Sequence, residues 1–480
     1  MIDLFYFSGL PVAVLGLGRS GLAAAQALKK SGAEVWAWDD NEDRRAVAAE
    51  DGIPLVDLTG CNWQELTSLV ISPGIPHLHP EPHPVAALAR QHNCEIIGDI
   101  ELLGRAMRNA SYIGVTGTNG KSTTTALIGH VLESAGRETQ TGGNLGPPAL
   151  LFQPLDQGGF YVLEMSSFQL ELTLSITFDV AVLLNISRDH LERHGGLDGY
   201  IAAKRLIFHR QTAPRTAVIG VDDEICQRLC RELSEAGEQI VVPVSGLGRA
   251  RGGVFARDGV LYDDTEGHED PVIDLRELSS LPGSHNWQNA AAAYAASKAA
   301  GVEPPVIAAC LRSYPGLPHR QELLAIIDGI GYVNDSKATN ADAAAKALAC
   351  YDPIYWIAGG RAKAGDLSAL EASFPRIAPR IAHAFLIGEA ETDFAKALEG
   401  RVAATCCDDL ATALGAARRQ ALADGRPGAV VLLSPAAASF DQYADFEARG
   451  EAFRGLVAAL PGVRDEDALP GVPRAGGRLQ

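Results

Sequence analysis

The residues whose types and spacing point most directly to chemistry lie between positions 113 and 124. A short apolar run is followed there by a glycine-punctuated turn and by Lys121 and Ser122, which open a helix predicted over 123–135. Small residues let backbone N–H groups converge on an anion, Lys121 can reach outer phosphates, and the Ser122 hydroxyl can hold Mg²⁺. The turn is therefore predicted to bind a nucleoside triphosphate, although Val115 stands where the common P-loop pattern has its first glycine. A chance Gly-Lys-Ser in a surface turn is the alternative, which the flanking strand and helix disfavour.

Two further strand ends place metal-binding side chains near this turn. The apolar strand predicted over 160–163 ends at Glu164, and a hard cation at a triphosphate prefers such oxygen donors. The next strand, 180–184, leads into Asp189 and His190. His190 could be a core or capping histidine. Its position at a strand end on the same sheet edge favours a functional role over such a structural one. Lys204, on a helix predicted over 197–208, is expected from spacing alone to be solvated.

A second glycine-rich turn lies near the N-terminus. The strand predicted over 12–15 leads into the turn 16–21, an alanine-rich helix follows, and the strand 34–38 ends at Asp39. This order is the full dinucleotide-binding fingerprint, in which glycines admit a pyrophosphate and the acid can bind a ribose hydroxyl. Any nucleoside diphosphate offers the same groups, so NAD is only one candidate, and a turn without a ligand is the alternative.

Several shorter segments also carry candidate residues. The turn 142–146 can present amides to phosphates. An apolar strand is predicted over 68–71, before the turn 72–75, and a strand-like run over 254–262. Asn286 and Asn289 lie one turn apart on a predicted helix, where they suit a base or a hydroxyl, with helix capping as the equal alternative. Segment 314–320 is predicted to be an interdomain linker, from which Arg320 could reach a phosphate when the domains close.

Three α/β units are predicted to position these residues. They are an N-terminal Rossmann-like domain (1–98), a central P-loop-type mononucleotide-binding domain (99–316) and a C-terminal Rossmann-like domain (317–465), followed by a frayed tail (466–480). Strands of the third unit are predicted near 323–327, 331–334, 354–358, 383–387 and 429–433, so that segments 335–340, 359–363 and 434–443 lie at their carboxyl ends. Open parallel sheets bind ligands at those ends.

Composition limits the class of protein. The formal net charge of −18 over 480 residues argues against a nucleic acid partner. We expect a cytoplasmic protein without a membrane association, because no apolar run approaches the length of a membrane span and residues 1–10 lack a leader pattern. The eight cysteines include no CxxC pair and are expected to be reduced. The three histidines and three prolines of segment 77–83 predict an extended loop with solvated histidines, in preference to a metal site.

Five of these segments together resemble the Mur ligases of peptidoglycan synthesis. The segments are 116–123, 164–170, 185–190, 283–289 and 319–320, and the likeness runs from about residue 10 to residue 455. The most discriminating segment is 334–340, where sister ligases and folylpolyglutamate synthases carry different residues, and 433–443 agrees with it.

The resemblance implies a role for particular residues of this chain. The UDP substrate would be held by Gly18, Arg19, Ser20, Asp39, Gly74, Asn144 and Ser166. ATP would be bound by Gly117, Thr118, Asn119, Gly120, Lys121, Ser122, Thr123, Asn286, Arg320 and Asp335. One Mg²⁺ ion would be held by Ser122 and Glu164, and a second by His190 and a carbamylated Lys204. The catalytic residues would be Lys121, His190, Lys204 and Lys337, and the D-glutamate pocket would comprise Thr339, Lys363, Ser439 and Phe446.

The resemblance also implies an activity. An ATP-dependent ligase would join D-glutamate to the L-alanine carboxylate of UDP-N-acetylmuramoyl-L-alanine through an acyl phosphate, as a monomer in the cytoplasm. A sister ligase adding another amino acid is one alternative, which residues 335–340 disfavour. A NAD-dependent oxidoreductase, based on the turn 16–21, would leave the phosphate loop unexplained. A nucleotide-switched binding protein without chemistry would not need a buried lysine and histidine beside a metal.

Overall fold

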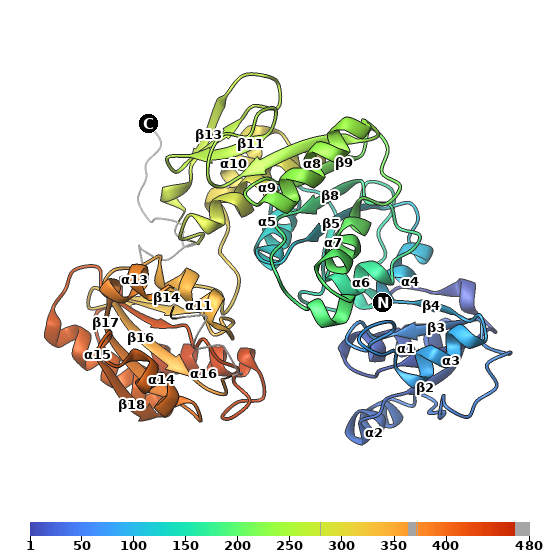
Figure 1. The fold of residues 1–480 in the computed structure, drawn as a ribbon, viewed down its shortest axis with the longest axis horizontal. Helices are drawn as coiled ribbons and strands as arrows, with labels where there is room; N and C mark the ends of the chain where they lie inside the picture. The colour runs from blue at the N-terminus through green and yellow to red at the C-terminus, as the bar shows by residue number, and fades with distance from the viewer. Residues whose placement is uncertain (279, 363–370, 372, 466–480) are drawn as a thin grey trace. The chain divides into compact units, whose positions relative to one another are not determined.

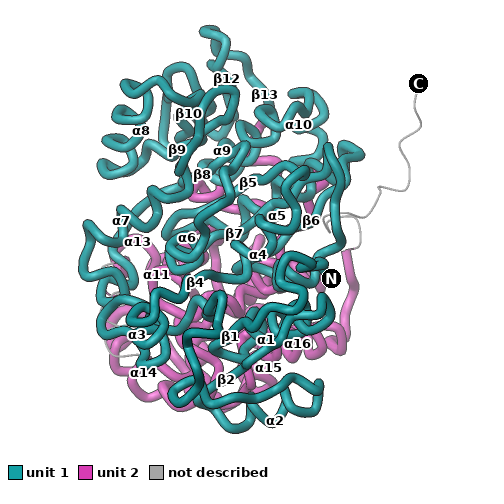
Figure 2. Tube along the Cα trace, turned by 90° about the vertical axis from the view of Figure 1, so that its right-hand side faces the viewer, with its two compact units in different colours: residues 1–273, 287–311 teal, residues 274–286, 312–480 magenta. Residues whose placement is uncertain are grey.

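The computed structural model of the chain describes residues 1–278, 280–362, 371 and 373–465. Its strands form three separate sheets, as Figure 1 shows along the chain. Two compact units contain them: residues 1–273 with 287–311, and residues 274–286 with 312–480 (Figure 2). The α/β class and the three sheets confirm the predicted fold, while the first two predicted domains share one compact unit and their exact boundaries stay a prediction.

The first sheet holds the dinucleotide-type turn. Its order is β2-β1-β3-β4, all parallel, with bounds β1 Pro11–Leu15, β2 Glu34–Trp38, β3 Ser68–Ile71 and β4 Glu95–Ile97. The strand β3 is buried along its whole length, as expected where helices cover both faces of a parallel sheet. The helices of this part are α1 Arg19–Lys30, α2 Glu42–Glu50, α3 Pro84–Gln91 and α4 Asp99–Ala106.

The second sheet carries the phosphate loop near its middle. Its order is β13-β12-β11-β10-β9-β8-β5-β7-β6. The bounds are β5 Ser111–Thr116, β6 Thr139–Gly143, β7 Phe160–Glu164, β8 Val180–Leu183, β9 Thr216–Gly220, β10 Ile240–Ser245, β11 Val254–Arg257, β12 Val260–Asp263 and β13 Asp270–Asp274. The accompanying helices are α5 Lys121–Ser134, α6 Ser167–Glu171, α7 Leu197–Arg205, α8 Glu224–Ala236, α9 His285–Ala299 and α10 Pro304–Ser313.

The third sheet lies in the second compact unit, with order β14-β15-β19-β16-β17-β18. Its strands are β14 Glu322–Ile327, β15 Ile330–Asn334, β16 Ile354–Gly359, β17 Ile381–Ile387, β18 Ala404–Asp408 and β19 Val430–Leu433. Successive residues of β16 face opposite sides: Trp356 packs in one hydrophobic cluster and Tyr355 in another. The helices α11 Ala341–Leu348 and α14 Glu391–Leu398 contribute to the first cluster, and α15 Leu410–Asp424 and α16 Phe446–Ala458 to the second. The short helix α13 spans Phe374–Ile377.

Local signals at helix ends explain several boundaries. Asp223 and Asp409 each accept a backbone N–H at the start of α8 and α15. Both helices end at a glycine in the left-handed conformation, Gly237 and Gly425, which lacks the Cβ that this conformation penalises. Sequence signals of this kind are local, so these helices follow from short stretches of chain.

Two sequence expectations are wrong in detail. The apolar run 254–262 is a hairpin of two strands, β11 and β12, because the chain reverses at Asp258 and Gly259, both with positive φ. The 77–83 histidines are not all solvated, since His77 is buried beside Glu171, at 3.9 Å, and burial lowers its pKa. His83 instead caps α3 by accepting the Val85 N–H at 3.2 Å.

Candidate active site

The phosphate loop joins β5 to α5, and β5 lies between β7 and β8 in the sheet. Gly120 begins α5 with a φ of +85°, and a Cβ built on it would lie 2.2 Å from the Asn289 Oδ1 atom. Only glycine fits there, for both steric and conformational reasons. The first N–H groups of a helix have no partner within it, so this end of α5 offers donors and partial positive charge to an anion. The predicted strand–turn–helix is confirmed, and its role as a phosphate cradle stays a prediction.

Asn185, which follows β8, holds the loop in shape. Its Oδ1 accepts the Asn119 N–H at 2.9 Å, and its backbone oxygen accepts the Thr118 N–H at 2.9 Å. The Asn185 amide in turn donates to Gln288 Oε1 at 3.2 Å. Asn185 was not among the predicted site residues, and the only sequence signal for it was its position at the end of a strand beside β5.

Two lysines converge on one backbone oxygen of the phosphate loop. The Lys121 amine donates to Gly117 O at 3.0 Å and to Thr118 O at 2.9 Å. The Lys204 amine donates to the same Gly117 oxygen at 2.9 Å and to Thr116 Oγ1 at 3.3 Å. The pair concentrates positive charge where an outer phosphate of a nucleotide would lie.

Lys204 is 1% exposed, so the expectation of a solvated lysine from spacing alone is wrong. Burial, with help from Lys121, lowers the pKa of Lys204 to about 7. The Tyr200 ring lies 4.8 Å from the Lys204 amine, and the Tyr200 hydroxyl is 3.2 Å from Thr118 Oγ1. Sequence reasoning missed Tyr200, although its position one helical turn before Lys204 was a usable signal. An amine with such a pKa is neutral part of the time at neutral pH and can act as a nucleophile.

Glu164 has the environment of a cation ligand. It is 3% exposed at the end of β7, and one carboxylate oxygen accepts the Asn144 amide at 2.7 Å. The second oxygen is buried and has no hydrogen-bond partner. Buried polar atoms are nearly always satisfied, so an oxygen left in this state fits a bound cation. Ser122, 5% exposed in the first turn of α5, lies on the same sheet edge.

His190 is less embedded than predicted. Its side chain is 51% exposed, its φ is +49°, and the Asp189 carboxylate lies 3.5 Å from its Nε2 atom. The His190 ring contacts the Phe168 ring, at 5.3 Å between centroids, and Phe168 stacks on His194 at 5.2 Å. His194 is fixed by Ser167 Oγ at 2.9 Å and a Glu171 carboxylate oxygen at 3.0 Å. The alternative class of a binding protein was disfavoured partly on a buried histidine, and that part of the argument does not hold.

The described residues contain no group of three or more His, Cys, Asp and Glu side chains close enough to hold a metal ion. The chemistry of the donors still fits Mg²⁺ at the first predicted position, because a hydroxyl and a carboxylate with a free oxygen are hard ligands. In such sites substrate phosphates and water complete the shell. For the second position, a bare Lys204 amine that donates to Gly117 O cannot be a ligand, since an ammonium has no lone pair.

The N-terminal turn adjoins the loops of the second sheet. The Arg19 guanidinium donates to Gly146 O at 2.6 Å, and the Arg193 guanidinium donates to Gly74 O at 2.8 Å. The first of these contacts joins two segments that were predicted to touch the same substrate, 16–21 and 142–146. The other predicted residues lie at helix starts: Gly18 and Ser20 at α1, and Ser166 at α6, where its hydroxyl accepts the Gln169 N–H.

Asp39 stabilises the glycine turn 16–21 itself. Its carboxylate accepts the Leu17 N–H at 2.6 Å and the Asn41 N–H at 2.9 Å, and it is 5% exposed. The first of these bonds fixes the glycine turn 16–21 against the end of β2. An acid at this position thus shapes the pyrophosphate turn, in addition to any contact with a ribose.

In the second unit, the predicted residues lie at the carboxyl ends of adjacent strands. Asp335 follows β15 and accepts from Ser434 Oγ at 2.8 Å, and burial raises its pKa to about 7. The Lys337 amine lies 4.6 Å above the Phe446 ring, while Ser439 is 2% exposed. Thr339 is half-buried in the 335–340 loop. The structure therefore gathers these predicted catalytic and amino-acid-binding residues at one edge of the third sheet.

Three predicted residues require separate description. Asn286 is 7% exposed, and its amide donates to Pro282 O at 2.8 Å. Arg320 is half-buried, and its backbone N–H donates to Leu317 O at 3.3 Å in the segment predicted as a linker. Lys363 lies outside the described residues, as does the predicted tail 466–480.

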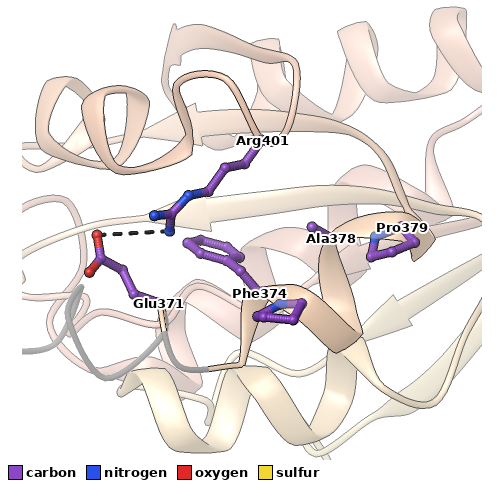
Figure 3. A pocket seen from close by; sticks show the side chains of 6 residues that line it. Glu371, Phe374, Ala378, Pro379 and Arg401 are labelled. Carbon is purple, nitrogen blue, oxygen red and sulfur yellow. Dashed lines mark ion pairs between the residues drawn. The ribbon is translucent and has the colours of Figure 1, made fainter.

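A cavity of about 520 Å³ in the second unit is lined by none of the predicted site residues that the structure describes. Figure 3 shows Phe374 and Arg401 in its lining. The Arg401 guanidinium lies 5.2 Å from the centre of the Phe374 ring and 3.9 Å from the Glu371 carboxylate. Its charged groups are paired with each other, so the cavity offers no unmatched charge to a substrate.

Two further findings concern the predicted class of protein. None of the described helices is long and apolar enough to cross a bilayer. The eight cysteines form no disulfide; five are buried, two are partly buried, and Cys406 is exposed.

Comparison with known proteins extends these observations. Residues 115–297 match the Mur ligase middle domain family. UDP-N-acetylmuramoylalanine–D-glutamate ligase from Rhodospirillum rubrum is 51% identical over 473 residues, covering 97% of this chain and 98% of the relative. The ligase of the same name from Paramagnetospirillum magneticum is 52% identical over 460 residues, with 96% and 99% covered.

Solved structures show the same fold at lower identity. UDP-N-acetylmuramate-alanine ligase from Thermotoga maritima aligns with a TM-score of 0.58 at 18% identity, over 94% of this chain and all of the other. MurF from Acinetobacter baumannii aligns with a TM-score of 0.57 at 20% identity, over 95% of this chain and 92% of the other. At these identities the likeness concerns the fold alone.

Proposed function

Because the chain belongs to the UDP-N-acetylmuramoylalanine–D-glutamate ligases of the Mur ligase family, we propose that it joins D-glutamate to UDP-N-acetylmuramoyl-L-alanine with ATP. The observation that carries the proposal is the 51% identity over 97% of the chain, which includes the third sheet as well as the ATP-binding middle part. The product is an intermediate of peptidoglycan, which places the protein in cell wall synthesis and hence in cell shape and division. We also propose that it acts in the cytoplasm as a monomer.

The chemistry requires ATP because a carboxylate is a poor electrophile. Transfer of the γ-phosphoryl group to the L-alanine carboxylate gives an acyl phosphate and ADP. The D-glutamate amine then attacks the acyl carbon, phosphate leaves, and an amide bond forms. The first step brings two anions together, so positive charge around the transferred group is the main catalytic requirement.

The phosphate loop supplies that charge. The N-terminus of α5 and the Lys121 amine would bind the β- and γ-phosphates, with Lys121 exchanging its backbone acceptors Gly117 O and Thr118 O for phosphate oxygens. The residues from Gly117 to Thr123 would form this cradle, and Asn286 would contact the adenine. Arg320 and Asp335 would approach the nucleotide from the second unit, with Lys337 beside them. Acyl phosphates hydrolyse in water, so closure of the third domain about segment 314–320 would protect the intermediate.

The residues present fit Mg²⁺ at Ser122 and Glu164, and a second ion would be held by His190 and a carbamylated Lys204. When bound, these ions neutralise charge on the transferred phosphoryl group. The free buried oxygen of Glu164 and the buried, partly neutral amine of Lys204 support these assignments.

The two other substrates would bind to different sets of loops. The UDP substrate would contact Gly18, Arg19, Ser20, Asp39, Gly74, Asn144 and Ser166. This role is supported by the bond from Arg19 to Gly146 O, which joins two of the loops concerned. The D-glutamate pocket would comprise Thr339, Lys363, Ser439 and Phe446.

Phosphate release with UDP-N-acetylmuramoyl-L-alanine, ATP and a panel of amino acids tests the proposed reaction. D-glutamate is expected to be the one amino acid that supports rapid release, because the loops at the third sheet would select it. Omission of each substrate in turn provides the control. Equal turnover with L-alanine or with a diamino acid would instead indicate a sister ligase.

Calorimetry distinguishes the two candidate ligands of the glycine turn 16–21, UDP-N-acetylmuramoyl-L-alanine and NAD. UDP-N-acetylmuramoyl-L-alanine is expected to bind and NAD is not, although both offer a pyrophosphate to the same amides. Arg19→Ala should weaken binding of the UDP compound, because Arg19 links this turn to Gly146. Arg228→Ala, at an exposed position on α8 away from the predicted substrate residues, is the matched control. Tight NAD binding without binding of the UDP compound would support the oxidoreductase alternative.

A further inference from the structure

Arg449, in the first turns of α16, is buried among the loops of the third sheet. It is 1% exposed, although it carries a guanidinium group. Its Nε donates to Ser336 Oγ at 3.1 Å, and its Nη2 donates to Ser336 O at 2.9 Å and to Ala437 O at 3.2 Å. The side chain therefore ties the 335–340 loop to the 434–443 loop. Both loops carry residues predicted for the amino-acid pocket.

The remaining nitrogen of Arg449 faces a third loop. Gly360 follows β16 with a φ of +125°, and a Cβ built on it would lie 3.2 Å from the Arg449 Nη1 atom. That Nη1 atom is buried and has no hydrogen-bond partner. Because β15, β19 and β16 are neighbours in the sheet, Arg449 lies where the three loops at their carboxyl ends meet.

The charge of Arg449 is not neutralised locally. Within the described part of the chain, no carboxylate lies within 4.0 Å of the guanidinium; Asp441 acts on it from further away, and its carboxylate accepts the Glu389 N–H at 3.0 Å. Burial lowers the pKa of Arg449 to about 10, which still leaves it protonated at neutral pH. Burying a cation without a counter-ion costs free energy, so the presence of Arg449 favours binding of an anionic ligand.

We propose that Arg449 is a positioning and specificity residue of the amino-acid pocket: it fixes the three loops and supplies the buried positive charge that favours a substrate with a second carboxylate. The inference rests on the proposed D-glutamate function and adds a residue to it. Thr339, Ser439 and Phe446 provide hydroxyls and an aromatic ring, whereas Arg449 provides a permanent charge and two unused N–H donors on Nη1. The proposal predicts a preference for glutamate over its neutral amide, which has almost the same shape.

Steady-state kinetics of Arg449→Met, Arg449→Gln and Arg449→Lys test the proposal. In the Met and Gln variants the KM for D-glutamate is expected to rise about tenfold or more, because a buried charge interaction is lost. The KM for the UDP substrate is expected to stay within about threefold, since the charge acts at the amino-acid pocket. The KM for ATP is expected to rise less than that for D-glutamate, because Asp335 lies in a loop that Arg449 fixes. Arg449→Lys keeps the charge and should recover part of the loss. Arg454→Met is the matched control, because Arg454 lies on the same helix and pairs with Glu322 at 2.9 Å.

The same variants distinguish the possible outcomes. A D-glutamate KM that is unchanged in both Arg449→Met and Arg449→Gln would overturn the proposal, and so would a parallel rise in all three KM values, which is the mark of a structural role. Discrimination between D-glutamate and D-glutamine should fall in Arg449→Met and persist in Arg449→Lys; loss in both would also overturn it. A wild-type enzyme that does not use D-glutamate would contradict the proposed function, and the two failures are thus distinguishable.

Discussion

The Lys121→Ala variant is expected to lose turnover by about a hundredfold or more while keeping its fold. Removing a single preorganised donor to developing charge costs about 3 kcal/mol in other enzymes, and Lys121 offers a full charge to the transferred phosphoryl group. Its amine donates to Gly117 O and Thr118 O, which are loop carbonyls. The side chain is therefore expected to contribute little to stability.

Single-turnover phosphate release and a thermal melt measure the two halves of this prediction. Lys396→Ala is the matched control, because Lys396 is 73% exposed on α14 and lies far along the chain from the phosphate loop. Lys121→Arg is informative as well, since it keeps the charge and changes the geometry of the donors. Activity near the wild-type level in Lys121→Ala would refute the assignment of the ATP site.

The second large effect is expected at Lys204, which we propose to be carbamylated. The neutral amine attacks CO₂, a C–N bond forms, one proton is released, and the product is a carbamate anion with two acceptor oxygens. Burial and the neighbouring Lys121 lower the pKa of Lys204 to about 7, so a useful fraction is neutral at physiological pH. An anion in place of the ammonium would also remove the repulsion between two lysines that share Gly117 O.

Lys204→Ala is expected to lose activity by about a hundredfold, and small carboxylates such as formate should restore part of it by occupying the space of the carbamate. Activity of the wild type should also fall in CO₂-free buffer and return with bicarbonate. A readout independent of turnover is the carbamate resonance of wild-type protein in ¹³C-bicarbonate, which Lys204→Arg should lack. Arg205→Ala, at the adjacent exposed position, is the control. Unchanged turnover in Lys204→Ala, or no carbamate signal in the wild type, would remove the proposal.

Much of the fold could be predicted from local sequence patterns. The glycine turns at 16–21 and 117–120, with their flanking strands β1 and β5, were predicted because glycine spacing and short apolar runs act over a few residues. The strands β2 and β3 were predicted to the residue for the same reason. The hairpin of β11 and β12 was missed, since Asp258 and Gly259 interrupt an apolar run that continues on both sides.

What only the tertiary structure decided is the environment of each charged group. Spacing on α7 predicted a solvated Lys204, and the packing of α7 against β5 and the phosphate loop buries it. His190 was predicted beside a metal and is half exposed. Asn185 and Arg449 act by joining loops that are remote in sequence. Burial, and with it the pKa and the free energy of a charge, depends on segments distant along the chain, so no local pattern could predict these features.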